Sequence, residues 1–340
     1  MVIKNEAKLD DLLSRPAPEL IGLMQRLDGE IMILGIAGKM GISLGRMAMR
    51  AIAEAGVKKR VIGVSRFSNL DAQALSEGYG METIRCDLLD AGAVAALPRV
   101  KNILFMAGRK FGTQGDEELT WAINTLAPGN VAVHFSESRI AAFSTGNVYP
   151  LAPPASGGCI ETDPVGPVGE YAQSCLGRER VFQYYSRARG TPVCLIRLNY
   201  AMDLRYGVLH DLARKVWRDE PVNIAVGQFN CIWQGDANHQ ALMAFEHCQT
   251  PANILNVTGP ELVSVRYAAS TFAGLMGKSV VFAGEDSGAA LLSNPAKAIS
   301  LFGYPRVSLL RMLEWTAQWV MAGGPSLDKP THFEETGGRY

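Results

Sequence analysis

Short apolar runs recur through the first 200 residues of the chain, and helical patterns separate them. Six of these runs are expected to be strands: residues 30–35, 60–65, 82–86, 102–107, 139–144 and 192–198. Continuous apolar runs of this length are typical of strands that are covered on both faces. Between the first two runs, the apolar residues from Met40 to Ala55 fall on one face of a helix. The alternation predicts strand–helix–strand units and therefore a parallel sheet.

The pattern changes after residue 200, where helical segments are interrupted by the short strand patterns NIAVG, NILNVTG and SVVFAG. We expect these segments to form a smaller mixed lobe over the carboxyl edge of the sheet. The predicted fold class is α/β, a Rossmann-type doubly wound parallel sheet with a small C-terminal substrate lobe. Four parts are expected: an N-terminal helical extension over 1–28, a Rossmann domain over 29–200, the lobe over 201–325, interleaved with the sheet, and a tail over 326–340.

Charge and composition exclude several classes of protein. Lys+Arg and Asp+Glu both total 33 and the basic residues are scattered, so a nucleic-acid-binding protein is not expected. No apolar run approaches the length of a membrane span, and the N-terminus lacks the apolar stretch of a signal peptide. The six cysteines form no C-x-x-C pair, and the five histidines have no metal-ligand spacing. These features indicate a cytoplasmic protein without a membrane anchor or a bound metal.

The first chemical motif is a glycine turn. Residues 35–41, GIAGKMG, follow the first predicted strand and open the predicted helix. Gly35 permits the tight turn, Gly38 lets the backbone approach a pyrophosphate, and Gly41 allows the helix to pack closely on the strand. Lys39 and Met40 lie between these glycines and are expected to contact the same ligand. The turn predicts a dinucleotide site, and a purely structural glycine turn is the alternative.

The spacing G-x-x-G-x-x-G resembles that of the extended short-chain dehydrogenase/reductases, and specifically of the NAD-dependent epimerase/dehydratase family. The resemblance spans roughly residues 30–320 and implies a nicotinamide dinucleotide cofactor. It also implies further cofactor-site residues: Asp87 and Leu88 at the adenine ring, Ala107 and Gly108 beneath the cofactor, Asn124 in support of the active-site strand, and Asn199 after the sixth strand.

The phosphate preference of the cofactor is expected to depend on the end of the second strand. An acidic side chain there would accept hydrogen bonds from the ribose 2′-hydroxyl of NAD and repel a 2′-phosphate. This chain instead has Ser65 and Arg66. Because hydroxyl and guanidinium groups suit a phosphate, NADP is preferred and NAD is the alternative. A solvated surface arginine without a ligand contact is the other interpretation of Arg66.

The catalytic residues are expected from a second run. FSTGNVYP (143–150) resembles the strand-end motif of the family, and Thr145 takes the place of the hydroxyl that binds the reacting oxygen of the substrate. Tyr171 opens a helical run 26 residues later, after a loop over 151–170 that is dense in proline and glycine. The resemblance implies that Tyr171 transfers the proton while hydride moves to or from the nicotinamide.

One residue departs from the family pattern. Cys175 stands where the family has a lysine, one helical turn after the tyrosine. A nearby ammonium would lower the tyrosine pKa from its ordinary value near 10 and hold the nicotinamide ribose. A thiol cannot do this, so Cys175 is expected to be a neutral packing residue beside the cofactor. Arg178, on the same helical face, and Arg109 and Lys110, after the fourth strand, could replace the ammonium, or all three could be surface or substrate-anion residues.

Three further positions narrow the substrate and the reaction. The arginine that family members use on a sugar nucleotide diphosphate falls at Phe229, which argues against such a substrate. The acid and base of the family dehydratases fall at Gly146 and Asn147, which cannot transfer protons, so dehydration is not expected.

The expected function is NAD(P)-dependent oxidation, reduction or epimerisation at a hydroxyl-bearing carbon of a small polar molecule, such as a sugar or sugar acid. Two alternatives remain: a nicotinamide-binding sensor or scaffold without turnover, and a sugar-nucleotide epimerase. The resemblance further implies a homodimer formed through the helix that carries the tyrosine.

Overall fold

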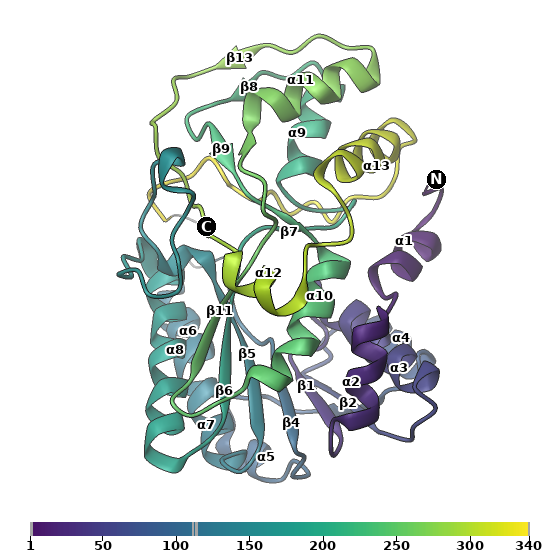
Figure 1. The fold of residues 1–340 in the computed structure, drawn as a ribbon, viewed down its shortest axis with the longest axis vertical. Coiled ribbons are helices and arrows are strands. Elements are labelled where there is room, and N and C mark those ends of the chain that lie inside the picture. The colour runs from purple at the N-terminus through teal and green to yellow at the C-terminus, as the bar shows by residue number, and fades with distance from the viewer. Residues whose placement is uncertain (1–2, 111, 113–114, 339–340) are drawn as a thin grey trace.

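The computed structural model describes residues 3–110, 112 and 115–338 of the chain. Figure 1 shows a parallel sheet with helices on both faces, and a smaller lobe beyond one end of the strands. Thr145, the last residue of a central strand, lines a chamber together with Tyr206 and Thr331 of the lobe side. The carboxyl edge of the sheet therefore faces the lobe.

Seven strands form the main sheet: β1 (Ile31–Leu34), β2 (Val61–Ser65), β3 (Glu82–Arg85), β4 (Asn102–Phe105), β5 (Arg139–Thr145), β6 (Val193–Leu198) and β11 (Asn253–Val257). Their order is β11-β6-β5-β4-β1-β2-β3, and all neighbours are parallel. The six predicted strands and the Rossmann-type fold class are confirmed. The strand order reverses between β1 and β4, which is where sheets of this kind open a crevice for a ligand.

Helices cover both faces of the sheet because the strand side chains alternate in direction. Ile31 and Ile33 pack toward one face, whereas Met32 and Leu34 pack toward the other. The first face carries α2 (Pro18–Arg26), α3 (Gly41–Glu54), α4 (Leu70–Gly78), α10 (Gln234–Met243) and α12 (Ala296–Phe302). The second carries α5 (Ala91–Ala95), α6 (Glu117–Trp121), the π-helical turn η1 (Ala122–Leu126), α7 (Ala127–His134) and α8 (Gly169–Arg189).

The lobe has its own hydrophobic core. It contains α9 (Val208–Trp217), α11 (Val265–Met276), α13 (Leu309–Met321) and the short strands β7 (Ala201–Met202), β8 (Val222–Asn223), β9 (Gln228–Phe229), β10 (Ile232–Trp233), β12 (Val263–Ser264) and β13 (Phe282–Ala283). Single helical turns occur at η2 (Gly146–Val148), η3 (Pro154–Ser156) and η4 (Ala244–His247). One strand expected in the lobe lies elsewhere: β11 pairs with β6, and its Leu255 and Val257 are buried in the core of the sheet.

The N-terminal segment connects the two parts of the molecule. Helix α1 (Glu6–Leu13) buries Leu9 and Leu13 in the core of the lobe. Helix α2 buries Leu20 and Leu23 against the sheet domain. Residues 1–2 of the expected extension and 339–340 of the expected tail lie outside the described residues. The described extension is therefore part of both cores.

Two segments without regular structure are tied down by distant contacts. The loop over 151–170 forms β-bridges from Ala152 to Ala290 and from Cys159 to Ser293. The tail after residue 325 buries Phe333 in the lobe, with its ring centroid 6.1 Å from that of Phe229. Both segments therefore have fixed positions beside the carboxyl edge of the sheet.

In the part of the chain that the structure describes, no helix combines the length and the apolar character that crossing a bilayer requires. The same described residues contain no group of three or more His, Cys, Asp or Glu side chains placed to hold a metal ion.

Candidate functional site

The glycine turn has the geometry of a phosphate cradle. Gly35 has a φ of +92°, and a Cβ atom there would lie 2.6 Å from the backbone nitrogen of Ala107. A Cβ atom at Gly41 would collide with the carbonyl of Ile36. At Gly38 the nearest atom would be the Gly35 oxygen at 3.3 Å, and this residue is exposed to the cleft. Gly35 and Gly41 thus serve the turn itself, whereas Gly38 leaves its outer side open to a ligand.

The start of α3 favours an anion. Its N-cap residue is Met40, and no described side chain caps the helix. The Gly41 N–H donates to the Gly38 carbonyl at 3.2 Å within the turn, and the first N–H groups together give the start of a helix a partial positive charge. Together with the open side of Gly38, they form a site that fits the pyrophosphate of a dinucleotide.

Two connected depressions extend from this turn. One, of about 480 Å³, is lined by Gly35 and Gly38 and also by Ser65, Arg66, Asp87, Leu88, Ala107 and Gly108. The other, of about 720 Å³, is lined by the turn residues through Gly41 and continues toward Tyr171 and Arg178. Both are lined by Gly35, Gly38 and Gly108. Their residues fit an adenosine half and a nicotinamide half of one cofactor, respectively.

A third, smaller chamber of about 170 Å³ adjoins the second depression. It is lined by Thr145 and Tyr171 from the sheet domain, by Asn199 after β6, and by Tyr206 and Thr331 from the lobe side. Lys39, Met40 and Lys110 line both this chamber and the large cleft. The hydroxyl groups expected to handle the substrate are thus at one end of the predicted cofactor cleft.

The Tyr171 hydroxyl lies between Thr145 and Cys175. Hydrogen bonding to Thr145 and the positive charge of Arg178 lower the pKa of Tyr171, whereas burial and the Cys175 thiol raise it. Burial dominates, so the pKa lies well above the ordinary value near 10. Tyr171 as a whole is half-buried, and protein encloses its hydroxyl group.

Arg178 is the cation that acts on Tyr171 in this geometry. Its guanidinium is 5% exposed, and it donates from Nη1 to the Phe143 carbonyl at 2.9 Å and from Nη2 to Asn124 Oδ1 at 2.5 Å. Its Nε has no hydrogen-bond partner among the described residues. A Cβ atom at Gly108 would lie 2.6 Å from Nη2. A side chain at position 108 would therefore displace the guanidinium from the floor of the cleft.

The other two candidate cations are placed differently. Arg109 forms an ion pair with Asp116 at 2.6 Å and donates to the Gly112 carbonyl, so it is bound to its own loop. Lys110 Nζ lies 5.8 Å from the centroid of the Tyr171 ring. Burial lowers the Lys110 pKa to about 8.

Two residues expected at the cofactor do not face any described cleft. Cys175 is 1% exposed in a small hydrophobic cluster, and burial raises its pKa, so it is a neutral thiol behind the tyrosine. Asn124 is fully buried in the π-helical turn η1. Its side chain pairs with the Arg109 backbone through both N–H and carbonyl, and it also bonds Ser174 and Arg178. These hydrogen bonds hold the loop after β4 in place.

A buried ion pair behind the site was missed by the sequence analysis. Glu179 follows Cys175 by one turn of α8 and binds Arg197 of β6 through two hydrogen bonds of 2.9 and 2.7 Å. It also accepts a hydrogen bond from Ser144, which precedes Thr145. This network fixes α8 to β5 and thus sets the distance between Tyr171 and Thr145. No local pattern in the sequence identified Glu179 as the acidic partner of Arg197.

Comparisons with known proteins agree with this geometry. The model of the NAD dependent epimerase/dehydratase family matches residues 31–202. No curated protein is similar enough to the sequence to be matched to it.

Several solved structures share the fold. A dTDP-glucose 4,6-dehydratase from Streptomyces venezuelae, solved with NAD and TYD bound, is 20% identical with a TM-score of 0.71, over 86% of this chain and 97% of that one. A UDP-glucuronic acid 4-epimerase from Bacillus cereus, solved with UDP-glucuronic acid and NAD, is 18% identical with a TM-score of 0.69, over 86% and 99%. A UDP-Glc/GlcNAc 4-epimerase from Campylobacter jejuni is 20% identical with a TM-score of 0.69, over 85% and 98%. At these identities the likeness establishes the fold alone.

Proposed function

Because the chain belongs to the NAD-dependent epimerase/dehydratase family, we propose that it oxidises, reduces or epimerises a hydroxyl-bearing carbon of a small polar substrate with a nicotinamide cofactor. The observation that carries this proposal is the meeting of the Thr145 and Tyr171 hydroxyls at the end of the cleft that begins at the glycine turn. A hydroxyl pair beside a nicotinamide is suited to move a proton while hydride is transferred.

Each residue then has a defined task. Thr145 orients the reacting oxygen, and Tyr171 gives or takes its proton. Arg178 stabilises the phenolate that forms on Tyr171, in place of the family ammonium that Cys175 cannot provide. Bound at the glycine turn, the nicotinamide cofactor accepts or returns hydride.

NADP is the preferred cofactor in this proposal. Ser65 and Arg66 lie at the end of β2 and line the same depression as Asp87 and Leu88. Arg66 is exposed at this position, where its guanidinium can reach a ribose phosphate. The three solved structures described above are sugar-nucleotide enzymes, and two of them were solved with NAD bound, so NAD remains the comparison in every assay.

The substrate is proposed to lack a nucleoside diphosphate. Phe229, at the position of the diphosphate-binding arginine in the family pattern, is 1% exposed and packs in the core of the lobe. Its ring therefore offers no charge to a phosphate. Gly146 and Asn147 follow Thr145 and provide neither acid nor base for a dehydration. A sugar or a sugar acid fits these constraints.

The test is a hydride-transfer assay on the purified chain. The absorbance of NADPH and NADH is followed with a panel of sugars, sugar acids and the corresponding ketoses, and each cofactor is also titrated alone. We expect tighter binding of NADP than of NAD, and turnover with at least one sugar or sugar acid. Tyr171→Phe should reduce turnover by about 100-fold or more while cofactor affinity stays within about two-fold, since general acid–base catalysis contributes this much.

Other results would contradict the proposal in distinct ways. Saturable cofactor binding without turnover on the whole panel would favour a nicotinamide-binding sensor or scaffold. Thermal stabilisation by UDP alone would favour a sugar-nucleotide epimerase. If neither dinucleotide binds, the function assigned to the cleft is wrong.

A further inference from the structure

The cleft beside the catalytic hydroxyls is strongly basic, although the whole chain has no net charge. Among the described residues that line its 720 Å³, seven are Lys or Arg and one, Asp10, is acidic. Asp10 is already paired with Arg205, which also pairs with Glu6 and Asp203. Such an excess of positive charge in a concave site attracts anions.

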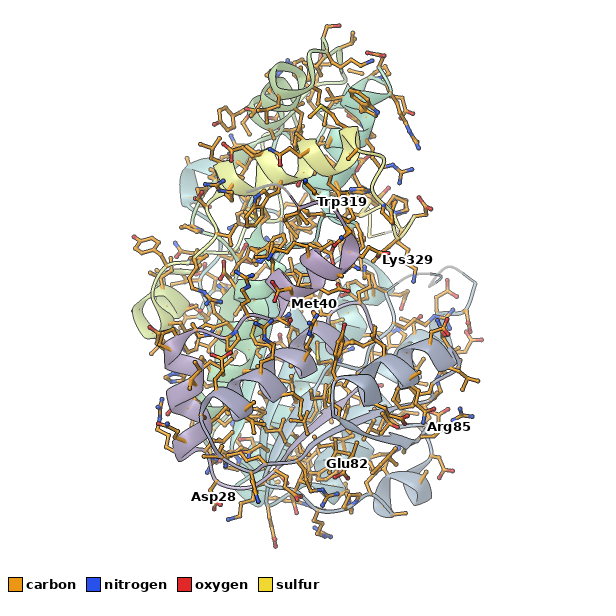
Figure 2. The ribbon with its side chains drawn as sticks, turned by 90° about the vertical axis from the view of Figure 1, so that its right-hand side faces the viewer. Asp28, Met40, Glu82, Arg85, Trp319 and Lys329 are labelled. Atoms are coloured by element: carbon orange, nitrogen blue, oxygen red, sulfur yellow. The ribbon has the colours of Figure 1, made fainter. Side chains whose placement is uncertain are left out.

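Three of these cations are lysines from segments far apart in the sequence. Lys39 lies in the glycine turn, Lys110 follows β4, and Lys329 lies in the C-terminal tail. The positive charges of Lys110 and Lys329 both act on Lys39 and lower its pKa, second only to burial. Figure 2 shows Lys329 above Met40 of the sheet domain and below Trp319 of the lobe. The fold therefore brings three like charges to one place.

Lys39 points toward the substrate chamber. Its ammonium lies 3.2 Å from the centroid of the Tyr206 ring, and Tyr206 belongs to the lobe side of the chamber that holds Tyr171 and Thr145. Solvent in the cleft reaches Lys39, while protein surrounds it on most other sides. The side chain of Lys39 therefore extends from the glycine turn toward Tyr206 and the chamber.

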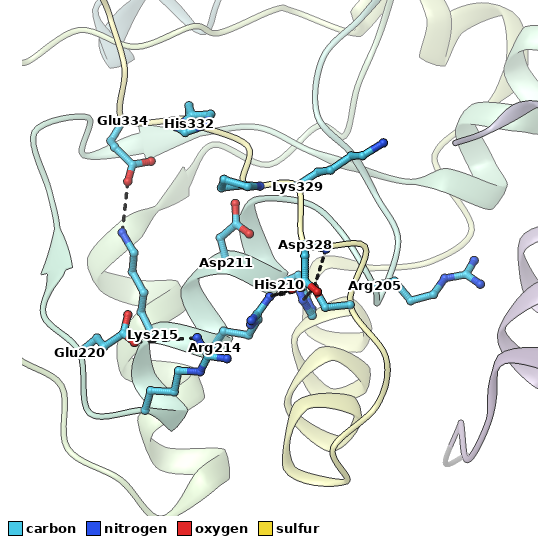
Figure 3. Close-up of a pocket in the computed structure, with 13 residues that line it drawn as sticks. Arg205, His210, Asp211, Arg214, Lys215, Glu220, Asp328, Lys329, His332 and Glu334 are labelled. Carbon is cyan, nitrogen blue, oxygen red and sulfur yellow. Dashed lines mark hydrogen bonds and ion pairs between the residues drawn. The ribbon is translucent and has the colours of Figure 1, made fainter. Parts of the chain in front are cut away.

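Helix α9 and the tail hold Lys329 in place. Asp328, the preceding residue, accepts a hydrogen bond from Arg214 at 2.9 Å. Thr331, two residues later, donates to Asp211 from its N–H at 2.8 Å and from its hydroxyl at 2.7 Å. Figure 3 shows these partners facing the tail, with the Lys329 side chain running away from them. The backbone on both sides of Lys329 is thus fixed, and its ammonium is free to face the cleft.

We propose that Lys39, Lys110 and Lys329 form a binding subsite for an anionic group of the substrate, a carboxylate or a phosphate monoester, at the edge of the chamber that contains Tyr171 and Thr145. The inference deepens the proposed function and rests on it, because it names the charge that the sugar-like substrate carries. Three ammonium groups around one anion give charge-assisted hydrogen bonds, which are about twice as strong as neutral ones. The C-terminal tail then contributes directly to substrate selection.

The subsite should respond to pH near neutrality. The pKa of Lys39 is lowered to about 7 and that of Lys110 to about 8. Other charged or titratable groups face these lysines: Lys329 of the tail, Asp211 of α9, Asp203 after β7, the Tyr206 phenol, and Tyr171 and Cys175 of α8. An anion binds the protonated lysines, so the affinity for the anion should fall as pH rises from about 6.5 to about 9. This pH range lies well below the ordinary lysine pKa near 10.4.

The test measures ligand binding to the full chain saturated with NADP. D-glucuronate, glucose 6-phosphate and uncharged D-glucose are compared by calorimetry at constant ionic strength. We expect at least one charged sugar to bind about ten-fold or more tightly than glucose, and the stronger of the two identifies carboxylate or phosphate as the preferred anion. Lys329→Met and Lys110→Met should each weaken charged-sugar binding by about ten-fold, which is the range for a hydrogen bond to a charged group.

Controls separate the subsite from net charge and from catalysis. Lys58→Met removes an exposed lysine just before β2, at the opposite edge of the sheet, and should change nothing. Tyr171→Phe should still bind the charged sugar although it does not turn it over. Equal affinity for glucose and both charged sugars would overturn the subsite while leaving the proposed function intact. Lys329→Met or Lys110→Met could instead weaken NADP binding and leave charged-sugar binding unchanged. That result would assign these lysines to the cofactor and would also overturn the proposed subsite.

Discussion

Near the hydroxyl of Tyr171, helix α8 places a neutral thiol at Cys175 and a cation at Arg178. A lysine at position 175 would lie beside Tyr171, but Cys175 is enclosed in an apolar cluster that includes Val148 and Leu292. Arg178 reaches the same region from one turn further along α8, and its charge lowers the pKa of Tyr171. Gly108 makes this possible because a larger residue there would occupy the place of the guanidinium.

Replacement of Arg178 tests this substitution of one cation by another. Arg178→Met should raise the Tyr171 pKa further, since an opposite charge nearby lowers a pKa by about 1–3 units. In the oxidation direction, the rise of kcat with pH should therefore move to higher pH, and kcat at neutral pH should fall by about 10-fold or more. Stopped-flow or steady-state rates across pH provide the measurement, and Arg178→Lys should restore part of the loss. A pH profile that Arg178→Met leaves unmoved would show that the cation does not act on Tyr171.

At the scale of elements, different glycines of the turn between β1 and α3 serve different functions. Gly41 is needed for the fold of the turn, and Gly38 for the approach of the cofactor. Gly41→Ala should lower the melting temperature by about 10 °C or more, because its Cβ atom meets the rigid carbonyl of Ile36. Gly38→Ala should leave the melting temperature within about 2 °C, since its Cβ atom meets only the Gly35 oxygen at 3.3 Å. Its methyl group would instead block the approach of a pyrophosphate and weaken cofactor binding by about ten-fold or more. Thermal melting and fluorescence titration with NADPH measure the two effects, and unaltered NADPH affinity in Gly38→Ala would place the pyrophosphate elsewhere.

The elements that the sequence predicted well are those that local pattern determines. Apolar runs located the strands of the sheet because a covered strand needs both faces apolar. The glycine spacing placed the turn, and the family pattern placed Thr145 and Tyr171. The loop over 151–170 and the tail could not be placed, because bonds such as Ala152 to Ala290 and Asp211 to Thr331 join residues more than 100 positions apart. The contribution of Lys329 to the cleft was unpredictable for the same reason.

At the scale of the whole molecule, the chain ends connect the sheet domain to the lobe. Helix α1 joins the core of the lobe while α2 joins that of the sheet domain, and the tail runs from α13 past α9 to the cleft. Asp10 of α1 and Leu327 and Lys329 of the tail line the large cleft, so both segments contribute to its wall. The expected homodimer stays a prediction, because the structure describes a single chain.

The contact between α9 and the tail predicts a loss of stability in mild acid. His210 of α9 is 3% exposed, its Nε2 lies 3.1 Å from Ser326 Oγ of the tail, and burial and the Arg214 charge lower its pKa to about 4. A hydrogen bond to the Leu204 backbone and the charges of Asp203 and Asp328 act in the opposite direction and are smaller. Below the ordinary histidine pKa of 6.5, His210 is protonated in the unfolded chain but stays neutral in the folded chain. The free energy of unfolding therefore falls as pH drops from about 6.5 to about 4.

The size of this effect can be isolated with a variant. A histidine whose pKa is lowered by this amount reduces the free energy of unfolding by about 2–3 kcal/mol between pH 7 and pH 4.5. In His210→Gln this term is removed, so the variant should lose about that much less stability than the original chain over the same interval. Urea unfolding at several pH values measures the difference, and His332→Gln, at an exposed tail histidine, is the matched control. If the free energy of unfolding falls equally in His210→Gln and in the original chain, His210 is not held neutral by burial. His210 would then be protonated in the folded chain while the lobe–tail contact stays intact.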